Sequence, residues 1–222
     1  MPRVLHDGLL AWAVITMTGP AHATLISAEP DDFAVGTVVV DTFPGLSLAV
    51  EGRPGSGVQV LDGFSPFNGR NLATTGSSVF GQLPRHSADV PQGWDALNGL
   101  LRLDFAAPTD FVQIDLIFDD DDFGRLSVFD NTGSLLDSVF VTGDGRGPTA
   151  FQTATVSRPS ADIAYALAGG DLGEALFLDN LQYNFLPLAE PSTTGIFLIG
   201  LAGIGFIVGR RRTACKTKGH NE

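Results

Sequence analysis

The densest set of side chains that could do chemistry is a run of four aspartates, from Asp119 to Asp122. Carboxylate oxygens at this density are hard ligands of the kind that calcium prefers. Set against an EF-hand loop, Asp119 and Asp121 take the first and third positions, but Phe123 stands at the fifth, where an oxygen ligand is needed. The residues that follow have the pattern of a strand instead of a helix. We expect either a calcium-binding turn or a solvated acidic hairpin turn, and not an EF-hand.

Trp94 and Asp95 form a second candidate, a site for a sugar. Trp94 is the only tryptophan between residues 24 and 186, and it lies in a segment, 91–95, with the composition of a loop. An exposed indole ring could stack on a pyranose while the neighbouring carboxylate accepts hydrogen bonds from its hydroxyls. A tryptophan buried in the core to pin the loop explains the same residues, so both interpretations stay open.

The region between residues 24 and 186 contains few residues suited to nucleophilic or metal-dependent catalysis. Between residues 24 and 186 there is one histidine, His86, and no lysine, and the only cysteine of the chain is Cys215. These counts exclude a histidine-rich zinc site, a Schiff base and a thiolate nucleophile from that region. Ser87 and Asp89 follow His86, but a catalytic triad is assembled from separate segments, so we interpret them as a surface loop. We expect a non-enzymatic protein; the alternative is a polysaccharide-active enzyme that uses two of its many carboxylates.

The same region is strongly acidic. It contains seven arginines and 22 acidic residues, which gives a formal charge of −15. Such a surface repels a phosphate backbone, so we expect no nucleic acid partner. Hydrophobic residues make up 44% of the chain, which is enough for a packed core. Because the region has no cysteine, the core or a bound metal must hold the fold without disulfides.

Short runs of alternating apolar residues, separated by turn residues, predict strands throughout residues 24–186. The clearest run is 111–118, in which Val112, Ile114 and Leu116 share one face. No segment there has a sustained helical period. We therefore predict an all-β domain, a two-sheet sandwich of the jelly-roll type. The predicted strands are 37–41, 46–51, 58–61, 78–80, 100–105, 111–118, 126–129, 135–141, 150–156, 163–167 and 175–185.

The N-terminal residues have the pattern of a cleavable signal peptide. Arg3 precedes an apolar stretch, 9–15, and the small residues Ala21 and Ala23 stand in an A-x-A arrangement a few residues later. We expect signal peptidase to cut before Thr24, which makes residues 1–23 the signal peptide and the protein an exported one.

The C-terminal region predicts a membrane anchor. Residues 193–209 are uncharged and apolar, and as a helix they would span roughly 25 Å at 1.5 Å per residue. Three arginines, Arg210, Arg211 and Arg212, follow directly and would hold that end in the cytoplasm together with the tail, 213–222. A plain single-pass anchor is the simplest interpretation of this pattern.

The residues just before the span suggest a more specific role. Glu190, Pro191 and Ser192, the apolar span and the arginine cluster together resemble the PEP-CTERM sorting signal, over residues 187–212. This sequence departs from the family at Ala189, where the family usually has proline, and in carrying a tail after the arginines. The resemblance implies an inner-membrane-anchored precursor that exosortase cuts near Glu190 and Pro191. It also implies a mature protein at the cell surface or in the extracellular matrix, in an exopolysaccharide or biofilm context.

A weaker resemblance concerns the domain between the two ends. The stretch Leu178 to Leu181 is similar to the last strand of jelly-roll carbohydrate-binding modules. Such modules often hold a structural calcium, which implies that Asp31 or Asp32 meets Asp179; the alternative is that these acids are surface turn residues. We thus expect an exported surface protein that is structural or binds polysaccharide.

Overall fold

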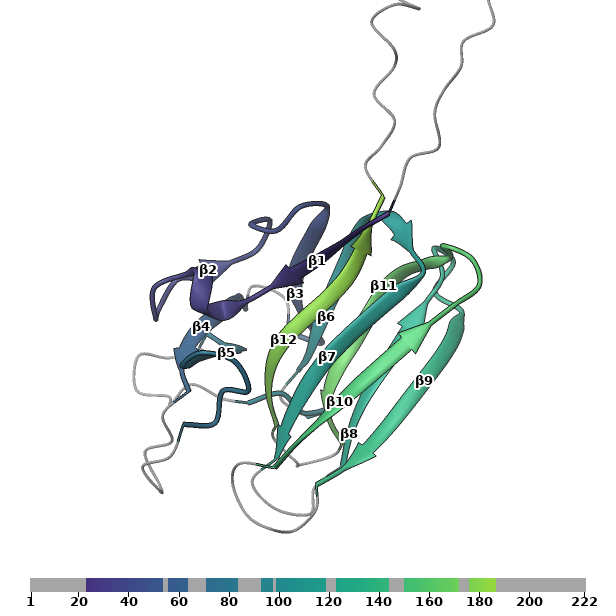
Figure 1. Ribbon diagram of the computed structural model, residues 1–222. Helices are drawn as coiled ribbons and strands as arrows, with labels where there is room; N and C mark the ends of the chain where they lie inside the picture. Colours follow the sequence, from purple (N-terminus) through teal and green to yellow (C-terminus); the bar gives the residue numbers. More distant parts are fainter. Residues whose placement is uncertain are drawn as a thin grey trace, which may run out of the picture. The chain divides into compact units, whose positions relative to one another are not determined.

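Alternation of buried and exposed side chains builds the long strands of the domain (Figure 1). In β3 (Leu46–Glu51), Leu46, Leu48 and Val50 are buried while the residues between them are half-exposed. The computed structural model describes residues 23–53, 56–63, 71–83, 93–97, 99–118, 123–143, 150–171 and 176–186. These residues all belong to one compact unit, His22–Pro187.

Several predicted features lie outside the described residues. They are Ala21 with most of the signal peptide, the Asp119–Asp122 run, His86, and the sorting signal with Glu190, Pro191, Ser192, Arg210, Arg211 and Arg212. The described part of the chain contains no helix long and apolar enough to cross a membrane, and the predicted span, 193–209, is not in it.

The described residues form twelve strands and one short 3₁₀ helix, which confirms the predicted all-β class. Each predicted strand overlaps an observed one; β1 was not predicted, and β6 and β8 are longer than expected. The elements are β1 (Thr24–Ala28), η1 (Pro30–Asp32), β2 (Val38–Val39), β3, β4 (Val58–Asp62), β5 (Ser78–Gln82), β6 (Leu100–Thr109), β7 (Phe111–Phe118), β8 (Phe123–Phe129), β9 (Leu135–Thr142), β10 (Ala150–Ser157), β11 (Ile163–Gly170) and β12 (Phe177–Phe185).

Two antiparallel sheets face each other, as predicted. The larger sheet has the order β10-β7-β12-β5-β4-β2, with β1 paired to β12, and the five-stranded sheet has the order β3-β6-β11-β8-β9. From β5 onward the chain repeatedly crosses from one sheet to the other, so most neighbours in a sheet are distant in sequence. Figure 1 shows the two layers, with β1 lying along β12.

The core lies between the sheets. It is apolar on both inner faces, and burial of this surface is the main term that stabilises the sandwich. Tyr183 of β12 is buried in it, and its hydroxyl donates a hydrogen bond to the Pro44 carbonyl at 2.6 Å, which joins residues far apart in sequence. Burial raises the pKa of Tyr183 to about 12. Among the described residues the fully packed core members lie between Ala28 and Tyr183, so the 22–187 unit has a hydrophobic core of its own, as an independently folding domain requires.

A bulge in β12 decides which side chains of the last strand face outward. Asn180 has a φ of 46°, a left-handed conformation that asparagine tolerates better than most residues. The register shift between Asp179 and Gln182 lets both Leu178 and Leu181 enter the core. Asp179 is left on the outer side of the sheet, directly opposite Asp115 of β7.

A candidate binding face on the five-stranded sheet

The outer face of the five-stranded sheet carries a set of aromatic and charged groups that neighbouring strands bring together. Along β8, the odd-numbered residues from Phe123 to Phe129 point outward, because Leu126 and Val128 between them are fully buried. The strand pairing then places Tyr165 of β11 beside Phe129, and Asp104 of β6 beside Tyr165. Residues from three separate strands thus form one row across this face.

Three of these side chains stack in a row that we call the Arg102 ladder: Arg102, Tyr165 and Phe129. The rings of Tyr165 and Phe129 are nearly parallel, with centroids 4.7 Å apart. The Arg102 guanidinium carbon lies 4.1 Å from the centroid of the Tyr165 ring. Because β11 runs between β6 and β8, Arg102 and Phe129 cover opposite faces of the tyrosine. Stacking and cation–π attraction therefore hold the three side chains of the ladder together.

Two carboxylates hold the arginine of the ladder. Arg102 donates to Asp104 through Nε and Nη2, at 2.8–2.9 Å, and to Glu51 of β3 through Nη1, at 2.9 Å. Hydrogen bonding to Asp104 above all, and to Glu51, raises the pKa of Arg102 further above its usual value. The three side chains keep 29–44% of their surface exposed. The result is a rigid, solvent-facing set of planar polar groups.

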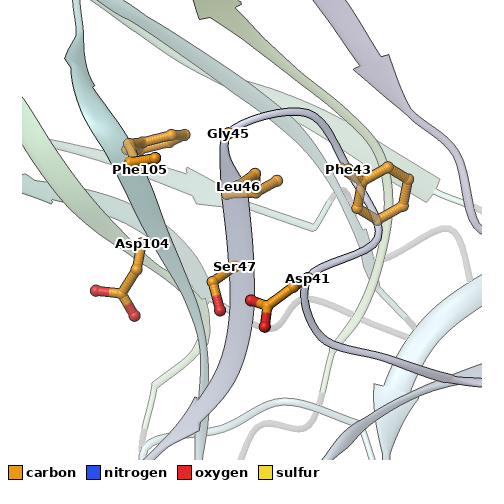
Figure 2. A pocket seen from close by; sticks show the side chains of 8 residues that line it. Asp41, Phe43, Gly45, Leu46, Ser47, Asp104 and Phe105 are labelled. Carbon is orange, nitrogen blue, oxygen red and sulfur yellow. The ribbon is translucent and has the colours of Figure 1, made fainter. Parts of the chain in front are cut away.

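An open pocket adjoins the ladder at the β3 edge of the sheet. It has a volume of about 360 Å³, and its walls come from the segment before β3, from β3 and from β6. Figure 2 shows Ser47 between Asp104 and Asp41, with Phe105 and Phe43 above them on either side. Asp104 lines the pocket and also accepts hydrogen bonds from Arg102 of the ladder, so the pocket and the ladder adjoin.

This surface is suited to a ligand rich in hydroxyl groups. Planar carboxylate and guanidinium groups can each engage two neighbouring hydroxyls, and aromatic rings cover the apolar C–H faces of a sugar. A few convergent polar groups beside apolar walls are typical of sites for small ligands.

Trp94 corrects the expectation of an exposed stacking ring. Its side chain is fully buried, and its indole Nε1 donates to the Phe80 carbonyl at 2.8 Å. Its backbone is bonded to Leu176 and Gly170, which fastens the 93–97 segment to the sandwich. Asp95 is buried too, and one carboxylate oxygen accepts from the Leu97 N–H at 2.7 Å. The ring is hidden because it fills the core, so neither residue can contact a sugar.

Asp31 and Asp179 converge on one loop, Asn71–Ser77, from opposite ends of the chain. Asp179 accepts from the backbone N–H groups of Thr74 and Thr75, at 2.7 and 2.9 Å. Asp31 accepts from the Ser77 N–H at 2.9 Å, whereas Asp32 is exposed on η1. Asp31 and Asp179 are therefore linked through the backbone N–H groups of this loop.

The same loop links further carboxylates, which with these two form what we call the acid cluster: Glu29, Asp31, Asp115 and Asp179. Thr75 donates its hydroxyl to Glu29 at 2.7 Å. Among the described residues no arginine pairs with any of the four. No group of three or more acidic, histidine or cysteine residues in the described ranges is arranged to hold a metal ion.

The Thr74 hydroxyl lies between two carboxylates of the acid cluster but has only one hydrogen to donate, which we call the shortage of hydrogens. Its oxygen lies 2.8 Å from Asp115 Oδ2 and 3.0 Å from Asp179 Oδ2. A hydroxyl has one hydrogen, so only one of these contacts can be a hydrogen bond while both carboxylates are ionised. Both acids are buried, and burial raises the pKa of Asp179 against the effect of its N–H donors. Asp115 also accepts from the Thr153 hydroxyl at 2.6 Å and from the Asn180 side-chain amide at 3.1 Å, so each carboxylate has donors besides Thr74.

The remaining predicted residues are only partly placed. Ala23 is exposed and Thr24 is the first residue of β1; cleavage before Thr24 stays a prediction. The Arg102 ladder was not predicted, because its members are distant in the sequence. Tyr165 is 36 positions from Phe129 and 63 positions from Arg102, although its strand lies between theirs in the sheet. Outward alternation in each strand was visible in the sequence, but the strand order was not.

Comparisons with known proteins give no assignment to a family. No protein-family model matches the chain, and no curated protein matches it significantly. Among solved structures, the K2 cleaved adhesin domain of Lys-gingipain has a TM-score of 0.47 at 12% identity, over 73% of this chain and 100% of that chain. The K1 cleaved adhesin domain of Lys-gingipain from Porphyromonas gingivalis W83 has a TM-score of 0.44 at 12% identity, over 72% and 97%.

A third solved structure comprises the CBM22-1 and GH10 modules of a Clostridium thermocellum xylanase complexed with xylohexaose. It has a TM-score of 0.33 at 8% identity, over 68% of this chain and 28% of that chain. Similarity at these levels does not define a relationship, so the residues and geometry of this chain must carry the functional argument.

Proposed function

We propose that this protein is an exported surface protein that binds a neutral polysaccharide on the outer face of its five-stranded sheet. The observation that supports this most directly is the Arg102 ladder with Asp104, which continues into the open pocket. The strand order of β5 to β12 supports a jelly-roll scaffold, in which eight strands are divided between two sheets. The strong negative charge disfavours acidic polymers as ligands.

A matched pair of arginines tests this proposal. Arg102→Lys keeps the charge but loses the planar fork, whereas Arg158→Lys makes the same change in the Arg158–Asp162 pair, which is outside the ladder. Affinity electrophoresis of the 22–187 unit through gels of cellulose derivatives, xylan, mannan and dextran measures retention. We expect the Arg102 variant to lose retention at least tenfold and the Arg158 variant to keep it. Equal effects, or no retention of the wild type in any gel, would refute the proposal.

A polysaccharide-cleaving enzyme is the second candidate, because the pocket is lined by two carboxylates, Asp41 and Asp104, beside Phe43 and Phe105. Paired carboxylates flanking a sugar are the machinery of glycoside hydrolysis. The salt bridge from Arg102 commits Asp104 to a structural contact, which favours binding over cleavage. Reducing-end release from the same polysaccharides, lost in both Asp41→Asn and Asp104→Asn, would establish the enzyme.

Calcium is a further part of the proposal. A cation near the acid cluster would satisfy the shortage of hydrogens at Thr74, although the N–H donors already present at Asp31 and Asp179 serve the same carboxylates. The Asp119–Asp122 run is the other candidate, outside the described residues. Calorimetric melting with calcium and with a chelator tests both: a higher melting temperature in calcium that Asp179→Asn removes would assign the ion to the acid cluster. Identical melting in both conditions would exclude a structural calcium.

Delivery by the PEP-CTERM route completes the proposal. The motif Glu190-Pro191-Ser192, the apolar span and the arginines support recognition by exosortase after signal peptidase has removed residues 1–23. Intact mass of the protein recovered from the cell surface tests this. We expect a species that begins at Thr24 and ends near Glu190; a full-length C-terminus in every fraction would favour a plain membrane anchor.

A further inference from the structure

A second aromatic group lies on the same face as the Arg102 ladder, near the other end of β8. It consists of Phe123 and Phe140, which we call the outer phenylalanine pair; their side chains are 56% and 68% exposed. Phe140 of β9 lies opposite Arg125 of β8, and Phe123 lies opposite Thr142. The two phenylalanines are therefore diagonal neighbours on one face, close enough for their rings to act together.

The outer phenylalanine pair contributes little to the core. Single exposed apolar residues are ordinary on a protein surface, but two neighbouring aromatic rings beside a polar ladder form a patch that is typical of a contact surface. The pairing of β8 with β9 places both rings on the outer face of the sheet.

The spacing between the two aromatic groups excludes a single sugar ring as the ligand of both. Phe123 and Phe129 are six positions apart in the sequence, which corresponds to about 20 Å along a strand at roughly 3.3 Å per residue. Between them lie Ser127 and Ser138, whose hydroxyls are 2.9 Å apart, and Arg125. Within the described ranges Arg125 forms no salt bridge, so its donors remain available to a ligand.

We propose that this face binds an extended, neutral polysaccharide chain lying along β8, held at one end by the Arg102 ladder and at the other by the outer phenylalanine pair. This inference rests on the proposed function and adds to it the ligand's form, an internal stretch of a linear chain. At one end the exposed rings of Phe123 and Phe140 cover the apolar side of a sugar unit, and at the other end Arg102, Asp104 and Glu51 form hydrogen bonds with the hydroxyls of another, while Ser138 and Arg125 bond to the units in the middle.

Charge favours this occupant over a second copy of the protein. Residues 24–186 carry a formal charge of −15, so two copies repel each other over distances of about a Debye length. An uncharged chain meets no such repulsion.

Isothermal titration with a length series of cello-, xylo- and manno-oligosaccharides, from monosaccharide to hexasaccharide, tests the inference on the 22–187 unit. We expect affinity to rise at least tenfold from the shortest oligosaccharide that binds to one long enough to reach both groups. Phe140→Ala should remove that gain in affinity with chain length. The matched control is Phe151→Ala, a ring 49% exposed on β10 of the other sheet, which should have no effect.

The possible failures are distinguishable. Affinity that does not change with chain length, or equal effects of the Phe140 and Phe151 substitutions, overturns the extended-chain inference while binding that needs Arg102 leaves the proposed function in place. Absence of binding at every length overturns both. A dimer in sedimentation velocity that Phe140→Ala dissolves would assign the pair to a second copy and also overturn the inference.

Discussion

Replacing Trp94 by phenylalanine should destabilise the domain without changing its affinity for polysaccharide. The substitution removes the hydrogen bond from the indole Nε1 to the Phe80 carbonyl, which is 2.8 Å long and fully buried. A buried acceptor left without its donor costs about 1–3 kcal/mol. The part of the ring that is lost adds about 1 kcal/mol of burial. We therefore expect the free energy of unfolding to fall by about 2–4 kcal/mol.

The assay is urea unfolding of the 22–187 unit, monitored by far-ultraviolet circular dichroism. Tryptophan fluorescence is unsuitable because Trp94 is the only tryptophan of this unit and the substitution removes it. For a domain of this size a loss of 2–4 kcal/mol lowers the melting temperature by about 5–15 °C. The dependence on urea should keep its slope, because the surface exposed on unfolding hardly changes. The exposed Phe140 offers the comparison, with a change within about 0.5 kcal/mol on substitution by alanine. A stable Trp94→Phe variant with reduced polysaccharide retention would refute the placement of this ring in the core.

Three further predictions concern single groups. Tyr183→Phe should reduce the free energy of unfolding by about 1–2 kcal/mol, while Tyr165→Phe should not. Because the pKa of Tyr183 is raised to about 12 in the folded state, the wild type should also lose stability as the pH rises through roughly 10 to 12. In a series of melts at different pH, Tyr183→Phe should lose less stability over this range. The pKa of Asp179 is raised in the folded state, so the folded protein binds its proton more tightly. Wild type should therefore gain stability relative to Asp179→Asn as pH falls from neutral towards about 4, and a difference that grows in the other direction contradicts this. Gly76→Ala should destabilise the domain more than Gly52→Ala in the same melts: both have positive φ, but only a Cβ at Gly76 meets the Asp31 carboxylate, so equal effects would argue against a tight loop–Asp31 contact.

Much of the fold was predictable because it depends on local patterns. Alternating apolar residues marked every strand from β2 to β12, since a side chain in a strand must face either core or solvent. β1 was missed because Thr24–Ala28 buries only Ala28, without an alternating pattern, and is held by its pairing with β12, at the far end of the chain. Likewise β6 extends to Thr109 through pairing with β11.

The candidate site was less predictable than the fold. Trp94 and Asp95 looked suited to a sugar by composition, but their exposure depends on packing that no local pattern reveals. Asp31 and Asp179 both accept from N–H groups of the 71–77 loop, and these backbone donors carry no side-chain signature that the sequence could reveal. The pairing of Asp179 with Asp115 depends on the β12 bulge at Asn180.

The sequence by itself determined the strand content, the strongly acidic composition and the presence of a single histidine, no lysine and no cysteine between residues 24 and 186. These properties follow from residue type and short-range order alone. Only the tertiary structure decided that Arg102, Tyr165 and Phe129 stack, and that Trp94 is hidden. The physical reason is that a binding face on a sheet is composed across strands, and strand order is set by how the whole chain buries its apolar surface.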